Sequence, residues 1–185
     1  IETRLGKEAQ VWPGIELDVL DLSLRGHLLV IVSPRWSERF SAVVEKLTKG
    51  SSPDSFTATI EDVLQTFDAF NPLYVAHYKQ KKPSLSDEVL EMLETKTKNP
   101  GCVIKEVTNS ISAGIYISHG HSSIYGSDIH DWGKYGERSR DLPDLRLPVD
   151  SFEHFCLLLK KDPAAINTVL NRKTHEDLAL CPFDD

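Results

Sequence analysis

The chain has 185 residues and a formal net charge of −7, with 40% hydrophobic and 26% charged residues. This length and composition predict one globular domain with enough chain to bury a hydrophobic core. The acidic balance excludes a protein that coats nucleic acid or an anionic membrane through its overall charge, although a local basic patch can still bind nucleic acid.

Cysteine usage and the chain ends bear on compartment and domain organisation. Cys102, Cys156 and Cys181 form no Cys-x-x-Cys pair and leave one thiol over in any disulfide scheme, which favours an intracellular protein, cytoplasmic or nuclear. No apolar run approaches the roughly 20 residues of a membrane-spanning helix, so we expect no membrane partner. Because the chain begins at Ile1, we expect residues 1–185 to be a single globular domain from a longer protein.

The first half of the chain predicts a β-hairpin followed by helices. Residues 15–24 alternate apolar and polar side chains and residues 27–32 form an apolar run, which together predict two strands joined at Arg25 and Gly26. Apolar residues at helical spacing predict amphipathic helices within 37–48, 54–67 and 85–93. Ser84 or Ser86 is the expected cap of the third helix. The intervening segment, residues 73–82, fits either a helix or a strand.

The second half predicts two further strands, a polar loop and two more helices. Residues 102–107 and 111–118 have the apolar composition of strands, and residues 145–147 suggest an edge strand. Asp150 and Glu153 have the spacing of a capping box at a helix start, and a last helix is expected after Pro163. The fold class is therefore α+β, with a mixed or mostly antiparallel sheet of about five strands covered by about four to five helices.

A loop rich in His, Asp, Tyr and Gly, residues 114–140, is the predicted working site. Imidazole and carboxylate groups are ligands that Zn²⁺, Mn²⁺ and Mg²⁺ accept, so a divalent metal is the expected cofactor. His119 and His121 lie two residues apart, and Asp128 and His130 repeat this offset. On an extended backbone each pair leaves on one face, and the glycines between them permit the pairs to approach each other. An ordinary solvated loop has the same composition.

A compact basic and aromatic patch precedes the third helix. It consists of Tyr78, Lys79, Lys81 and Lys82. Such a patch can contact phosphate groups, so nucleic acid is one possible partner, and a solvated run of charge is the alternative.

The central stretch also resembles the GIY-YIG nucleases. Gly114-Ile115-Tyr116 is followed by Ile124-Tyr125-Gly126, then by Arg138, Glu153 and Asn167. The resemblance implies that Tyr116 and Tyr125 orient or deprotonate a water, that Arg138 steadies the phosphate and that Glu153 holds the metal.

A second resemblance is to caspase-like proteases. Their catalytic histidine lies in a strand-end motif similar to Ile117-Ser118-His119-Gly120. A nucleophilic cysteine on a later strand is missing, since Cys156 falls on a predicted helix stripe, so this resemblance implies a degenerate protease fold.

The sequence thus leaves more than one class of function open. The first is a divalent-metal-dependent phosphodiesterase or nuclease centred on residues 114–140. The second is a non-catalytic domain that uses the same loop to hold a protein partner, and the third is the degenerate caspase-like fold.

Overall fold

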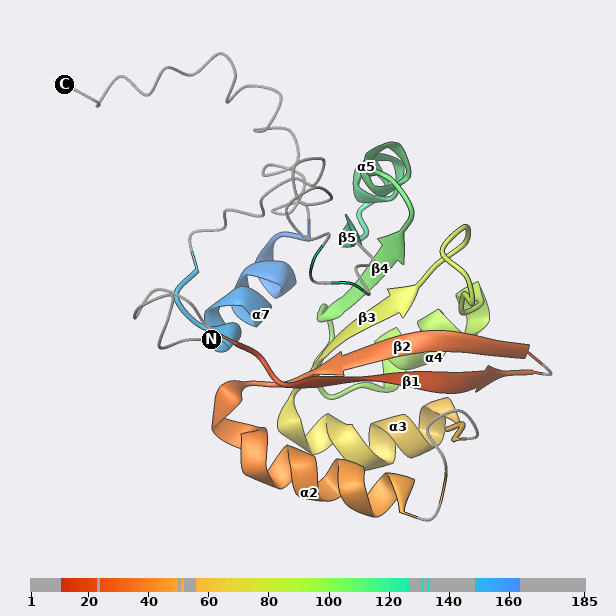
Figure 1. The fold of residues 1–185 in the computed structure, drawn as a ribbon. Helices are drawn as coiled ribbons and strands as arrows, with labels where there is room; N and C mark the ends of the chain where they lie inside the picture. Colours follow the sequence, from red (N-terminus) through yellow and green to blue (C-terminus); the bar gives the residue numbers. More distant parts are fainter. Residues whose placement is uncertain are drawn as a thin grey trace.

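Five strands form a mixed sheet whose spatial order follows the chain (Figure 1). The computed structural model describes residues 11–22, 24–49, 51, 56–126, 131, 133 and 149–163. The strands are β1 (Gly14–Asp21), β2 (Leu24–Ile31), β3 (Leu73–His77), β4 (Val103–Val107) and β5 (Ser123–Tyr125). The pairs β1–β2 and β2–β3 are antiparallel, and the pairs β3–β4 and β4–β5 are parallel. This arrangement confirms the predicted α+β class with a mixed sheet.

One face of the sheet is covered by three helices. These are α2 (Ser37–Thr48), α3 (Ile60–Phe67) and α4 (Asp87–Lys96), with the short 3-10 turns η1 (Pro34–Trp36) and η2 (Asp68–Phe70) at their connections. Figure 1 shows α2 and α3 side by side along the hairpin. Alternate strand residues such as Leu17, Val19 and Leu28 point into this core, because successive side chains of a strand leave on opposite faces.

Within the described residues, the opposite face is covered at one end only. Helix α7 (Phe152–Lys161) packs Phe152, Phe155 and Leu159 against strand residues that include Leu73 and Val75. Trp12 completes this second core, with its ring centroid 5.2 Å from that of Phe152. At the other end of the same strands, this face carries polar side chains instead of apolar ones.

The segment predicted as a strand over 111–118 is a helix, α5 (Ser110–Ser118), and that prediction was wrong. Asn109 caps it by accepting a hydrogen bond from Ser112 N at 2.9 Å. The strands on either side of it, β4 and β5, are parallel, and a parallel pair requires a crossover connection. Ala113 and Ile117, one helical turn apart, are its buried residues.

The predicted position of the hairpin turn and the predicted N-cap of the helix after residue 150 were also wrong. Arg25 and Gly26 lie inside β2, and the chain reverses after Asp21, where Leu22 has a left-handed φ of 56°. Helix α7 is capped by Ser151, whose hydroxyl accepts from His154 N at 3.1 Å, rather than by Asp150.

Other predictions were confirmed, or they concern residues that the structure does not describe. The helix over 37–48 is α2, and Ser86, one of the two expected caps, is the cap of α4. The ambiguous segment 73–82 begins with strand β3. The predicted strand at 145–147 and the helix after Pro163 lie outside the described residues. None of the helices that the structure describes is long and apolar enough to cross a membrane.

Candidate metal centre

Four polar residues lie in one row across the sheet, at the end that α7 does not cover. Asp18 pairs with His27 in the β1–β2 register, and His77 pairs with Glu106 in the β3–β4 register. The β2–β3 register ends at Leu28 and Ala76, so His27 and His77 are the next neighbours, and their ring centroids lie 4.9 Å apart. Together with Glu16 and Lys81, this row forms what we call the polar cluster: Glu16, Asp18, His27, His77, Lys81 and Glu106.

His27 lies between two carboxylates of β1. Its Nδ1 is 2.7 Å from Glu16 Oε1, and its Nε2 is 3.0 Å from Asp18 Oδ1. A neutral imidazole has one N–H to donate, so both contacts are satisfied when the ring is doubly protonated or when a cation binds one of its nitrogens.

His77 lies deeper in the polar cluster. Its side chain is 8% exposed, and its Nε2 is 3.4 Å from Glu106 Oε2 and 3.7 Å from Glu16 Oε1. Lys81 approaches the second oxygen of Glu106, with Nζ and Oε1 separated by 3.5 Å. Glu106 therefore lies between an imidazole and an ammonium group in a nearly buried setting.

Glu16, His27 and His77 offer ligand atoms that all lie within 4.8 Å of one another. Two imidazoles and one carboxylate form a common zinc and iron ligand set. With metal–ligand bonds of about 2.1 Å, ligand atoms around one ion lie roughly 3 to 3.5 Å apart. The separations from Glu16 Oε1, 2.7 and 3.7 Å, bracket that range, and all three ligand atoms lie within 4.8 Å of one another, so side-chain movements would bring them around one divalent ion.

Charge and access also suit a cation. Three carboxylates of this region, those of Glu16, Asp18 and Glu106, are accompanied by two cationic groups, Lys81 and Arg25, the latter 3.5 Å from Asp18. With neutral imidazoles this leaves one net negative charge. Glu16 is 49% exposed while His77 is almost buried, so the cluster opens to solvent on the β1 side. Three protein ligands leave a coordination position for water or substrate.

The four metal ligands predicted from the loop are only partly described. His119 is the C-cap of α5 and is exposed, whereas His121 Nδ1 lies 3.3 Å from the ammonium nitrogen of Lys105. Asp128 and His130 lie outside the described residues. Convergence of these four side chains therefore stays a prediction.

The four residues predicted to be catalytic lie on different elements. Tyr116 of α5 packs edge-on against Tyr78, with ring centroids 4.9 Å apart, and Tyr125 is half-buried in β5. Burial raises the pKa of Tyr125. Glu153 of α7 forms an ion pair with Arg35 at 3.2 Å, and Arg138 lies outside the described residues. No hydrogen bond or ion pair joins the three described members of this set, and their roles stay predictions.

The predicted basic patch is divided between three environments. Tyr78 is buried and donates to Asp87 Oδ1 at 2.5 Å, and burial, followed by this hydrogen bond, raises its pKa to about 12. Lys79 donates to the other oxygen of Asp87. Lys81 belongs to the polar cluster, and Lys82 donates to Ser84 Oγ at 2.9 Å.

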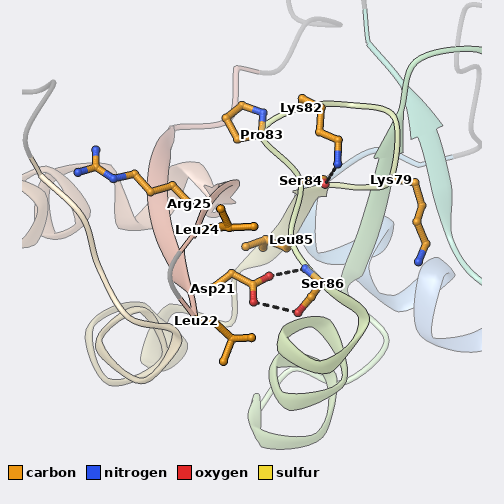
Figure 2. A pocket seen from close by; sticks show the side chains of 10 residues that line it. All are labelled: Asp21, Leu22, Leu24, Arg25, Lys79, Lys82, Pro83, Ser84, Leu85 and Ser86. Carbon is orange, nitrogen blue, oxygen red and sulfur yellow. Dashed lines mark hydrogen bonds between the residues drawn. The ribbon is translucent and has the colours of Figure 1, made fainter.

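Lys79 and Lys82 line a surface pocket of about 520 Å³ between the hairpin tip and the loop before α4 (Figure 2). Its apolar lining comes from Leu22, Leu24, Pro83 and Leu85. The buried carboxylate of Asp21 accepts hydrogen bonds from Ser86 N at 2.5 Å and from Ser86 Oγ at 3.0 Å, which joins the hairpin to α4. Arg25, which also lines the pocket, forms the ion pair with Asp18, so the pocket adjoins the polar cluster.

Comparisons with protein-family models, with curated proteins and with solved structures gave no match. The functional argument therefore depends on the geometry of this chain alone.

Sequence reasoning missed Glu16, His27 and His77 as a ligand set. One signal was present: both histidines lie within strongly apolar strand sequences, where a polar side chain requires a partner. The partners could not be recognised, because His77 comes from a strand that is distant in sequence and because the turn assigned to Arg25 and Gly26 gave the hairpin the wrong register.

Proposed function

We propose that the chain is a divalent-metal-dependent phosphodiesterase whose metal is held by Glu16, His27 and His77. The observation that carries the proposal is the convergence of these three ligand atoms within 4.8 Å at the open end of the sheet face. The proposal keeps the chemistry expected from the sequence and moves its centre from the loop at 114–140 to the sheet.

A divalent ion with an open coordination position supplies hydrolytic chemistry, since it lowers the pKa of a bound water to about 7 and polarises a phosphoryl oxygen. The surrounding carboxylates fit supporting roles. Asp18 contacts the second ring nitrogen of His27 and would hold that ring in its ligating orientation. Glu106 Oε2 lies 3.4 Å from the His77 nitrogen that also faces Glu16, so it would place a further carboxylate beside the ion. Lys81 neutralises part of the carboxylate charge next to the nearly buried imidazole of His77.

The neighbouring pocket supports an anionic substrate with an apolar part. Arg25, Lys79 and Lys82 provide cationic groups at its rim, and cationic side chains bind phosphate oxygens through charge-assisted hydrogen bonds. Leu22, Leu24 and Leu85 provide apolar surface for the organic group of an ester. This combination favours a phosphodiester over an uncharged substrate.

Hydrolysis of a chromogenic phosphodiester by chelator-treated protein supplied with Mn²⁺, Zn²⁺ or Mg²⁺ tests the proposal. We expect metal-dependent turnover that falls at least about 100-fold in His77→Gln and in Glu16→Gln, because each removes one of three ligands. His154→Gln is the matched control, since His154 is an exposed histidine of α7 that pairs with Asp150. Circular dichroism establishes that each variant is folded.

Two results contradict the proposal. One is turnover that responds to a metal yet is unchanged in both ligand variants, and the other is the absence of turnover with every ion tested.

A second candidate is the non-catalytic protein-interaction domain. Leu20, Leu22 and Leu24 are exposed at the hairpin tip, with Leu22 97% exposed, and grouped exposed apolar side chains are typical of binding surfaces. This candidate becomes the better account if no ion supports hydrolysis. The degenerate caspase-like fold is not proposed, because it required a strand leading to His119, and residues 110–118 form a helix.

A further inference from the structure

Lys105 is a charged residue in the interior of the protein. It is the central residue of β4, its exposed fraction is 6%, and it lies between buried Val103 and Val107 on its face of the sheet. Its ammonium nitrogen is 3.3 Å from His121 Nδ1 and 5.0 Å from the ring centroid of Tyr78. Among the residues that the structure describes, no carboxylate lies within 4.0 Å of this nitrogen.

Neither neighbour carries a negative charge that could balance the ammonium group. Burial, followed by the charge of Lys105, holds the pKa of His121 below its usual 6.5, so the imidazole is neutral at neutral pH. The phenol of Tyr78 donates its proton to Asp87 Oδ1, so this ring is uncharged as well. A buried cation is costly unless a hydrogen-bonded anion lies beside it, so this position favours binding of an anion.

The lysine borders a cavity that can admit such an anion. The cavity has a volume of about 190 Å³, and its lining includes Glu94, Val103, Lys105, Gly120 and His121. This is smaller than the sites of drug-sized ligands, which begin at about 300 Å³. Glu94 contributes a carboxylate to the lining, which disfavours a ligand with two negative charges.

We propose that this cavity is a binding site for a small monocarboxylate, held by the ammonium group of Lys105 and the imidazole of His121. When His121 Nδ1 accepts from Lys105, the neutral ring carries its proton on Nε2, which makes the ring a second donor for the ligand. The site is separate from the metal centre, since Lys105 and Glu106 are consecutive residues of β4 and point to opposite faces of the sheet.

Thermal unfolding of metal-free protein with acetate and with lactate tests this site without reference to the proposed hydrolysis. A ligand that binds only the folded state raises the melting temperature. We expect both carboxylates to raise the melting temperature of the wild type and to leave that of Lys105→Met unchanged. Lys96→Met is the matched control, because Lys96 is an exposed lysine that pairs with Glu61, and it should respond as the wild type does.

A second variant keeps Lys105 in place in case the methionine variant does not fold. Glu94→Gln removes the negative charge from the lining, so it should bind acetate several-fold more tightly than the wild type. The proposal is overturned if neither carboxylate stabilises the wild type, if Lys105→Met responds equally, or if Glu94→Gln binds acetate more weakly. Equal or stronger stabilisation by inorganic phosphate would overturn the assignment to a monocarboxylate.

Discussion

Two histidines of this chain have opposite electrostatic surroundings. His27 lies between the carboxylates of Glu16 and Asp18, at 2.7 and 3.0 Å, which favours a cation at the ring. His121 lies 3.3 Å from the ammonium group of Lys105, which disfavours one. The imidazole of His27 therefore fits a metal ligand on one face of the sheet, whereas that of His121 fits a partner for an anion on the other.

The lowered pKa of His121 predicts a pH dependence of stability. Burial, then Lys105 and His119, favour the neutral ring in the folded chain, while Glu94 and Asp87 act in the opposite direction. The unfolded chain binds this proton more readily than the folded chain does. The contribution of the neutral His121 ring to the unfolding free energy is therefore complete above about pH 6.5, and it is lost as the pH falls through the pKa of His121 in the folded chain. Urea unfolding between about pH 7.5 and pH 5 should show this loss for the wild type relative to His121→Gln.

The comparison with His121→Gln removes the contributions of the other titrating groups. A difference in unfolding free energy between the two proteins that stays constant across this pH range would show that His121 does not titrate as the geometry requires.

At the scale of elements, Gly26 explains how the hairpin fits against the rest of the fold. It pairs with Val19 inside β2, and a Cβ at this position would lie 2.5 Å from Leu85 Cδ2 and 2.9 Å from Leu85 N. The loop before α4 therefore approaches the strand as closely as a glycine allows. His27 N also donates to Pro83 O at 3.0 Å, which fixes the same approach.

Two glycine substitutions should consequently have opposite effects. Gly26→Ala should lower the unfolding free energy by about 1–3 kcal/mol, because backbone and side-chain atoms of Leu85 must move. Gly114→Ala in α5 should raise it by about 0.5–1 kcal/mol, since the added methyl group meets no atom within 4 Å and alanine favours a helix. Chemical denaturation measures both values, and effects of the same sign would contradict this account of Gly26.

Local patterns predicted many of the elements and few of their spatial relations. Alternation in residues 15–24 predicted the hairpin, and the spacing of Phe40, Val43 and Leu47 predicted α2, because both signals are contained within one element. Gly26 was misassigned to a turn because its requirement is contact with Leu85, far away in the chain. Residues 111–118 were misassigned to a strand because their apolar composition fits both structures, and the parallel pairing around them decides for a helix.

The candidate metal centre could not be predicted for a related reason. His27 and His77 become neighbours only through the pairing of β2 with β3, and Glu106 joins them only through the pairing of β3 with β4. Nothing in residues 73–82 alone distinguishes a strand from a helix. The sequence pattern therefore could not predict that these polar side chains lie in one row across the sheet.

At the scale of the whole molecule, the sheet separates two candidate sites. Helix α7 closes one end of one face and leaves the polar cluster at the other end, while α4 and the loop after α5 border the cavity of Lys105 on the opposite side of β4. Lys105 and Glu106 are adjacent in β4, yet they belong to different sites. Binding of a metal and binding of a carboxylate are therefore expected to occur independently, as for positions without shared partners.

The most direct test of the central claim is calorimetric titration of chelator-treated protein with Zn²⁺. We predict one ion per chain, with affinity reduced at least about 10-fold in His27→Ala and in His77→Ala and unchanged in the double variant His119→Ala with His121→Ala. Loss of binding in the His119 and His121 variant, with binding retained in the His27 and His77 variants, would contradict the account and place the metal in the loop.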